Sequence, residues 1–539
     1  MKKNLLLRAS RMMMSMALVA VMVVFASCSK QDDYCSVIPE DAALVARLDP
    51  VDLIQKNDVD LEKTALRLGM PANDLDEVKE FLDCGVDFES PLYLFVDERI
   101  NFGLVCKVKD ADDLEKAMLK EHVDVKSRDG YKWVETGNVW ICFNDQKLLA
   151  YGSPNGSVKE RRVQELMEQG EKKSILGTKL YEQLLKAEKP IAVNFSYGEF
   201  MKMAGRMPGA SGNAAVLSMV GALVPDCNCL VTFDIDGDEV SYTTDVYPND
   251  NKAEKLMEQF MGFMPPIEGK LLDSTIANPL VYFAGHFPGA SVLDFLKDIK
   301  IPGLMDQFEQ ADEQYGITKT LASLEGDVSF AVADNLDDFK FLVQADTKNE
   351  DYLKTIEKLA GQLHDVKLEK TGDKQYRFSQ MQYTWEEPDF QEFEDDEDSW
   401  EEYVDDDAAF DVPAVEYAPK GEFKPTAQFG SKDGRFYLTN DESLLGSKAE
   451  GKLKDFDIKG KNFFGFIDLE RLAQCALAKM NENNDRDNSS FAAVSMALKD
   501  FRDVTIQAEG LHAEAVLHMQ KGKSFVEALL NLVMVAKGN

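Results

Sequence analysis

Histidine and the short motifs of familiar enzyme active sites are scarce in this 539-residue chain. It has five His, and it contains no G-x-S-x-G nucleophile elbow, no H-E-x-x-H zinc motif and no G-x-x-x-x-G-K-[ST] phosphate loop. These absences exclude the enzyme classes that those motifs define. We therefore predict no catalytic residue, no metal site and no cofactor, and we predict that the protein is not an enzyme.

The remaining polar patterns favour structural roles. His286 in "AGHFPGAS" lies five residues before Ser291, the nearest approach to a nucleophile–base pair, but a loop His beside Gly is usually structural. His512 and His518 share a face of a predicted strand, yet they are too far apart to chelate one ion. The three Asp of "DIDGDE" mark a hairpin turn rather than a calcium loop.

Basic residues are outnumbered, with 60 Lys and Arg against 96 Asp and Glu, for a formal net charge of -36. A field of this sign repels nucleic acid and anionic lipid surfaces, so neither is an expected partner. After the N-terminal segment there is no run of 18 apolar residues, which excludes a later transmembrane helix.

The cysteines do not form a disulfide framework. Apart from Cys28 there are seven, an odd number, and Cys106 and Cys142 lie inside apolar strand-like runs. Cys227 and Cys229 in "DCNCL" could bind a metal or form a redox pair, but no second thiol pair lies near them in the sequence. We interpret these cysteines as small buried hydrophobic residues.

The N-terminal segment has the pattern of an export signal. A basic start is followed by an apolar stretch, Met12 to Phe25, of about 14 residues, too short to span a bilayer. The tetrapeptide "FASC" resembles a bacterial lipobox, and "SKQDDY" after it resembles the export signals of Bacteroidetes surface lipoproteins. We predict a signal peptide (1–27), lipidation at Cys28 and a lipidated linker (28–35). The alternative is an ordinary cleaved signal followed by a solvated linker.

Four pairs of segments recur in the same order along the chain. "PLYLFVDERINFGLVCKVKD" resembles "VSFAVADNLDDFKFLVQADT", with Asp97 and Asp334 each opening the turn. "PIAVNFSYGEFMKMA" resembles "NFFGFIDLERLAQCA", and "VTFDIDGDEVSYTTDVY" matches "VTIQAEGLHAEAVLHMQ" with Gly237 and Gly510 at the turn. "ALVARLDPVDLI" resembles "PLVYFAGHFPGASVLDFL". This order indicates an internal duplication.

The second half contains extra residues at 385–417. This segment holds 16 acidic residues and no Lys or Arg, and like charges at that density resist compaction. We expect an acidic flexible insert between two strands. Its aromatic side chains could instead dock on a partner, or its carboxylates could bind a cation, although the EF-hand spacing is absent.

The fold class that follows is α+β, with two tandem, diverged repeats at residues 36–265 and 270–535. Alternating runs such as "YKWVETGNVWICF" and "EVSYTTDVY" predict, in each repeat, a mainly antiparallel sheet with one wet face and helices on the other. Asp110 and Asn349 stand where helix N-caps belong. Whether the repeats pack side by side or join edge to edge stays open.

The lipobox, the onset "YCSVIPEDAALVARLDPVDLIQK" and "FFGFIDLERLAQCALAKM" together resemble an uncharacterised Bacteroidetes lipoprotein family, the domain of unknown function number 4836. The resemblance implies an envelope address and supplies no mechanism. We predict an envelope-anchored lipoprotein, held in the outer membrane by its lipid, with a non-enzymatic binding or structural role and a protein partner in the envelope. The alternative is an Asp/Glu-dependent hydrolase that acts on carbohydrate or peptide. Surface and periplasmic faces are both open.

Overall fold

The computed structural model describes residues 33–57, 83–154, 156, 158–206, 225–298, 304–333, 340–384, 420–475 and 498–529. The predicted signal peptide, Cys28 and the acidic insert lie outside these residues. Of the predicted linker, residues 33–35 are described, and they belong to the 3-10 helix η1 (Asp33–Val37). No helix within the described ranges is long and apolar enough to cross a membrane.

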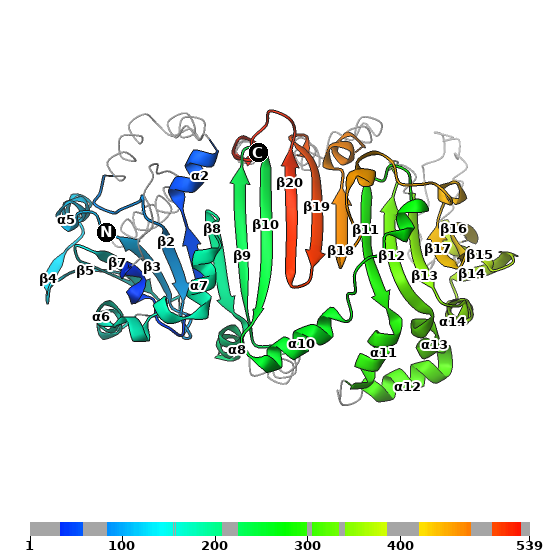
Figure 1. The fold of residues 1–539 in the computed structure, drawn as a ribbon, viewed down its shortest axis with the longest axis horizontal. Coiled ribbons are helices and arrows are strands. Elements are labelled where there is room, and N and C mark those ends of the chain that lie inside the picture. The colour runs from blue at the N-terminus through cyan, green and yellow to red at the C-terminus, as the bar shows by residue number, and fades with distance from the viewer. Residues whose placement is uncertain are drawn as a thin grey trace, which may run out of the picture.

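Twenty strands form one antiparallel sheet that runs the length of the molecule (Figure 1). In the first half the pairings give the spatial order β4-β5-β6-β7-β3-β2-β1-β8-β9-β10. The bounds are β1 (Leu44–Leu48), β2 (Leu92–Val96), β3 (Phe102–Lys107), β4 (Lys126–Arg128), β5 (Tyr131–Thr136), β6 (Val139–Phe143), β7 (Lys147–Gly152), β8 (Ile191–Ser196), β9 (Cys227–Asp236) and β10 (Glu239–Pro248).

In the second half the order is β14-β15-β16-β17-β13-β12-β11-β18-β19-β20. The bounds are β11 (Val281–Pro288), β12 (Leu324–Val332), β13 (Phe341–Thr347), β14 (Val366–Gly372), β15 (Gln375–Thr384), β16 (Lys420–Lys432), β17 (Arg435–Thr439), β18 (Phe463–Ile467), β19 (Phe501–Glu509) and β20 (His512–Met519). Each strand of the second half therefore has the neighbours of the strand numbered ten lower in the first. Three of the four pairs of similar segments contain strands at the same position in the two halves, namely β2 and β12, β8 and β18, and β9 and β19.

Helices connect these strands at the ends and over the faces of the sheet. The α-helices are α2 (Pro50–Lys56), α5 (Ala111–Lys120), α6 (Glu160–Glu168), α7 (Lys179–Lys186), α8 (Tyr197–Arg206), α10 (Asn251–Met261), α11 (Gly289–Asp298), α12 (Leu304–Tyr315), α13 (Ile317–Ser323) and α14 (Asp351–Ala360). Further 3-10 turns are η2 (Glu171–Lys173), η3 (Ile175–Gly177), η5 (Lys270–Asp273), η6 (Glu442–Leu444) and η7 (Gly451–Asp455). The α+β class is confirmed.

The predicted N-caps hold in part. The Asp110 side chain accepts from the backbone N–H groups of Asp112 and Asp113, which caps α5. The N-cap of α14 is Glu350, one residue later than predicted, and Asn349 instead accepts from the N–H of Asp351.

The two halves join edge to edge through β10 and β20, near the middle of the sheet (Figure 1). Tyr242 faces Ala515, and each lies five residues after the turn glycine of its own hairpin, Gly237 and Gly510. Both glycines have a positive φ, 59° and 62°, that side-chain-bearing residues rarely adopt. The junction therefore brings the same edge of each hairpin to the other.

The expectation of helices on one face and water on the other is wrong at the ends of the sheet. In the first half, neighbouring residues such as Trp133 and Val134 are both buried, and because side chains alternate they lie on opposite faces. One face packs against η1, α6, η3 and α7, and the other packs against α5. Phe436 and Tyr437 of β17 divide in the same way between two clusters. The alternating pattern did not predict this, because both faces of these strands carry large apolar or aromatic residues that are buried.

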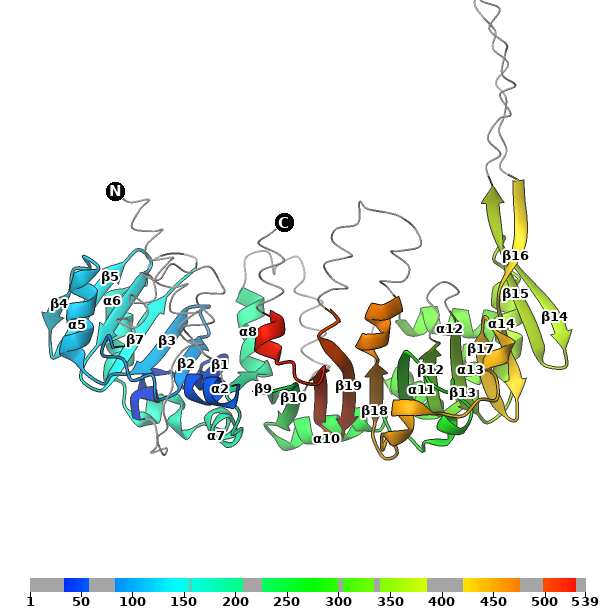
Figure 2. The same ribbon diagram turned by 90° about the horizontal axis from the view of Figure 1, so that it is seen from above.

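The β15–β16 hairpin extends beyond its neighbours. β14 pairs with β15 only as far as Gln380, and β17 pairs with β16 only from Gln428 onward. The last pair of the hairpin joins Thr384 to Lys420, the residues that flank the segment containing the acidic insert. Figure 2 shows this hairpin rising out of the body of the sheet.

Candidate functional site

The cysteines singled out from the sequence are buried in the core or part-exposed. Cys227 and Cys229 lie on one face of β9, and burial raises the pKa of Cys227 to about 11. Burial likewise raises the pKa of Cys106 and of Cys142 to about 12. Cys84, Cys106, Cys142, Cys227 and Cys229 are free thiols, and no group of three or more His, Cys, Asp or Glu among the described residues could hold a metal ion.

His286 of β11 is paired with a buried carboxylate that no sequence motif singled out. Its Nδ1 lies 3.2 Å from Oδ1 of Asp327 on β12, and Asp327 is 1% exposed. That carboxylate also accepts from the backbone N–H of Glu268 at 2.8 Å and of Gly269 at 2.7 Å. Ser291 lies on the surface of α11. The pairing therefore anchors the chain at residues 268–269 to the sheet.

The anchored chain forms one wall of a cavity of about 320 Å³. The opposite walls come from the start of β12, the end of β13 and the turn between β16 and β17. Six charged side chains line the cavity: Glu268, Lys270, Glu325, Asp346, Asp433 and Arg435. Its lining is mostly polar, so the cavity suits a polar solute better than an apolar one.

A β-bulge shapes the floor of this cavity. The register between β12 and β13 shifts between Leu324 and Val328, and Gly326 within the bulge has a φ of 137°. A Cβ at Gly326 would lie 2.6 Å from Cβ of Asp346, so no larger residue fits there without movement. The bulge and the glycine let the carboxylate of Asp346 come close to the backbone of β12.

Arg435 crosses the cavity wall and fixes two of its sides. Its Nε–H donates to Oδ1 of Asp346 at 3.0 Å, and its Nη1–H donates to Oγ of Ser274 at 3.0 Å. Glu325 accepts from the backbone N–H of Ala290 and lies 3.5 Å from Nζ of Lys348. The cavity is therefore a prearranged set of charges rather than a gap between loose side chains.

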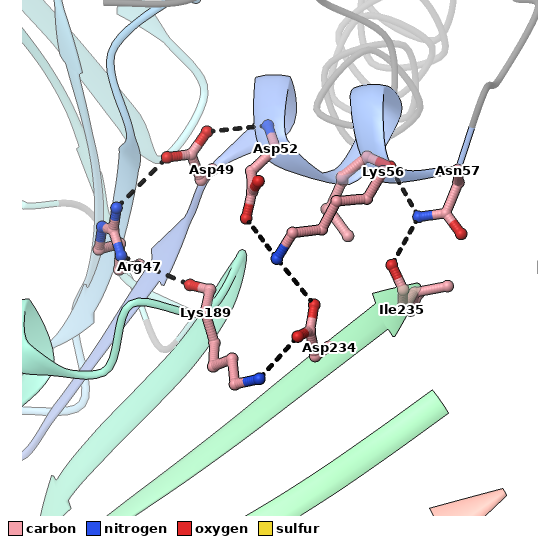
Figure 3. Close-up of polar contacts among 9 residues, drawn as sticks. Arg47, Asp49, Asp52, Lys56, Asn57, Lys189, Asp234 and Ile235 are labelled. Atoms are coloured by element: carbon pink, nitrogen blue, oxygen red, sulfur yellow. Dashed lines mark hydrogen bonds and ion pairs between the residues drawn. The ribbon is translucent and has the colours of Figure 1, made fainter. Parts of the chain in front are cut away.

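A second polar network joins helix α2 to strand β9 within the first half (Figure 3). Asp49 caps this helix by accepting from the N–H of Asp52 at 3.2 Å, and its other oxygen accepts from Nη2 of Arg47 at 3.3 Å. A Pro at the first position of the helix, Pro50, favours the helix start at this point.

The last turn of α2 is tied to the sheet by Asp234 of β9. Its carboxylate lies 3.2 Å from Nζ of Lys56 and 2.7 Å from Nζ of Lys189 (Figure 3). Burial opposes ionisation of Asp234, but the hydrogen bonds from Lys189 and Lys56 outweigh it and lower the pKa below its ordinary value. Asn57 adds a bond to the carbonyl of Ile235. Because these charges neutralise one another, the network holds the helix and offers no open site.

The two strand histidines lie at opposite ends of the junction between the halves. Nδ1 of His512 lies 2.8 Å from Oδ1 of Asp245, and Nε2 of His518 lies 3.4 Å from Oε1 of Glu239. His518 also lies 2.7 Å from the buried carboxylate of Asp503. Both histidines thus bridge β20 to β10, a role that their common face permits but that their sequence spacing alone did not indicate.

The residues of the cavity and of the α2 network were missed because their partners lie far away in the sequence. Asp327 is 59 residues from Glu268, and Asp234 is 178 residues from Lys56. Acidic residues are so abundant in this chain that an acid beside a strand is no signal by itself. A pattern restricted to acids that interrupt an apolar strand would have selected Asp327 and Asp234.

Comparison with protein families identifies the chain. A family described as "Domain of unknown function (DUF4836)" matches residues 34–391. The chain belongs to the DUF4836 family. The matched region runs from η1 through β15, so the DUF4836 match covers the first half, the junction strand β10 and the part of the cavity formed by Glu268, Glu325 and Asp346. The resemblance of the sequence to the DUF4836 family is confirmed.

The search of curated proteins gives no match. Among solved structures, the chain is similar to TP0453 in crystal form IV, at 10% identity and a TM-score of 0.25, over 40% of this chain and 80% of that one. Crystal form I of TP0453 gives 10% identity and a TM-score of 0.25 over 47% and 88% of the two chains. A likeness at this TM-score supports no conclusion about fold or function.

Proposed function

We propose that this DUF4836 protein is a lipid-anchored protein of the cell envelope, in the outer membrane, with a non-enzymatic binding or structural role and a protein partner there. The observation that carries the proposal is the continuous sheet of twenty strands, whose two halves pair directly through β10 and β20. A sheet hydrogen-bonded from end to end is a rigid, elongated platform, well suited to holding a binding surface away from an anchor.

The identical strand order of the halves supports a further part of the proposal, that they are diverged tandem repeats. Each half carries clusters of buried residues on both faces of its own part of the sheet. Equivalent strands that bury equivalent faces are expected from duplication, because a one-residue slip would turn an apolar face to solvent. The repeat ranges that we propose are 36–265 and 270–535.

The anchor is tested by two cysteine variants that lie close together in the sequence. Cys28→Ala removes the proposed acylation site, so the protein should move from the membrane fraction to the soluble fraction. Cys35→Ala is the matched control, because Cys35 is a buried core residue of η1 and its loss should leave the distribution unchanged. Membrane retention of Cys28→Ala, with the wild-type distribution, would show that another segment holds the protein.

A further inference from the structure

The cavity between the 268–270 segment and strands β12, β13 and β17 has the charge arrangement of a binding site for a small zwitterion. We infer that it binds a solute that carries both an ammonium and a carboxylate group, such as an amino acid or the end of a short peptide. The inference deepens the proposed binding role and rests on it.

The first argument is the rigidity of the walls. Asp327 holds the backbone at Glu268 and Gly269 by two bonds of 2.8 and 2.7 Å, and His286 holds Asp327 in turn. Arg435 joins the β13 wall to Ser274. A site whose walls are fixed before the ligand arrives loses less entropy on binding.

The second argument is the donor left over on Arg435. Two of its three nitrogens are occupied, by Asp346 and by Ser274, whereas Nη2 has no partner among the described residues. Among the described residues Lys270 is ion-paired only with Glu268, and both side chains are well exposed. A guanidinium N–H and an ammonium on neighbouring walls can bind a carboxylate of the ligand.

The third argument is the excess of acid around these donors. Four carboxylates face two cations in the lining, and Asp433 has no partner within the described parts of the chain. A simple anion would be repelled by this surplus, and a simple cation would leave the Arg435 donor unused. A zwitterion satisfies both, with its ammonium toward Asp433 and Glu325 and its carboxylate toward Arg435.

The size of the cavity sets the class of ligand. About 320 Å³ is at the small end of ligand pockets, which are about 300–1,000 Å³. The lining offers little apolar surface, so affinity must come from charge-assisted hydrogen bonds rather than from burial of hydrocarbon. These features favour a single amino acid or a dipeptide over a larger molecule.

The test is isothermal titration calorimetry of the full chain, at low salt, with three probes. L-lysine carries the carboxylate and the ammonium groups, cadaverine is the same skeleton without the carboxylate, and glutarate has carboxylates alone. We expect L-lysine to bind about tenfold or more tightly than either, which is the effect of one charge-assisted contact. Non-specific attraction to the acidic surface would instead favour cadaverine, and that ranking would overturn the inference, as would no binding of L-lysine.

Three variants locate the site. Arg435→Gln should lower the affinity for L-lysine about tenfold and should not weaken that for cadaverine, because it removes a cation and frees the carboxylate of Asp346. Asp433→Asn, in an exposed turn with φ of 55° that Asn tolerates, should weaken both amines without disturbing the fold. Arg377→Gln, an exposed Arg of β15 outside the cavity, is the matched control. Unchanged L-lysine affinity in both cavity variants would overturn the assignment of the cavity as the binding site. The envelope role is tested separately, by the fractionation of Cys28→Ala.

Discussion

Asp97, at the turn between β2 and β3, is the side chain whose removal should damage the first half most. It is 0% exposed, and its Oδ1 accepts from the backbone N–H of Arg99 at 2.9 Å and of Asn101 at 3.0 Å. Its Oδ2 accepts from the hydroxyl of Tyr151 and from the side-chain amide of Asn101. Asp97→Ala removes a buried acceptor that serves four donors.

The size of the effect follows from the donors left behind. Each buried donor without a partner costs about 1–3 kcal/mol, and the hydroxyl of Tyr151, which is also 0% exposed, loses the acceptor of its O–H. We expect the free energy of unfolding to fall by about 3–5 kcal/mol, in the range for breaking a buried polar network. Asp97→Asn keeps an oxygen for the two backbone N–H groups, so it should cost about half as much.

Tryptophan fluorescence can isolate this half during urea denaturation. Trp133 and Trp140 lie in or against the buried cluster that contains Tyr151, and the other two tryptophans of the chain, Trp385 and Trp400, belong to the acidic insert. Replacing those two with Phe leaves a signal from the first half alone. The double variant Asp97→Ala/Tyr151→Phe should lower the free energy of unfolding by less than the sum of the two single changes. Each single change already removes the same hydrogen bond, the one between Tyr151 and Asp97. A loss below about 1 kcal/mol for Asp97→Ala would refute the reasoning.

Three further predictions concern other parts of the chain. Lys340 and Ser443 lower the pKa of Asp441 to about 2, so the ionised carboxylate stabilises the fold above its ordinary pKa of 3.8, and this contribution is lost as the pH falls toward 2. In thermal melts between pH 4 and pH 2, Asp441→Asn should therefore lose less stability than the wild type. Equal pH profiles of the two proteins would contradict this. Burial raises the pKa of Cys106 and Cys142 to about 12, so mass spectrometry should find both alkylated by iodoacetamide at pH 8 much more slowly in the folded protein than in the urea-unfolded protein, and equal rates would contradict this. Replacing Glu386 to Glu416 with a short turn should shift the melting temperature only slightly, because Thr384 and Lys420 already face each other across the hairpin, and a drop of many degrees would mean that the insert packs on the body.

The local part of this fold could be predicted from the sequence, and the long-range part could not. The hairpin turn at Gly237 and the cap at Asp110 depend on neighbours within a few residues, and both are present. The exposure of β5 depends on what packs over it, and its Trp133 is covered by helices from distant segments. The same limit hid the candidate site, because Asp327, Glu268 and Arg435 come together only when the whole second half has folded.

The pairing of β10 with β20 at the junction determines which strands form the two outer edges of the sheet. Glu239 lies two residues after Gly237 and pairs with His518, which lies eight residues after Gly510. The distances are exchanged in the other pair, in which His512 lies two residues after Gly510 and Asp245 eight residues after Gly237. Each half therefore offers the same edge to its counterpart, and joining them leaves β4 and β14 as the outermost of the described strands. An open edge invites further pairing unless it is short or charged. β4 has only three residues, all exposed, and β14 carries Lys367, Glu369 and Lys370, so both edges have the features that stop a sheet from growing.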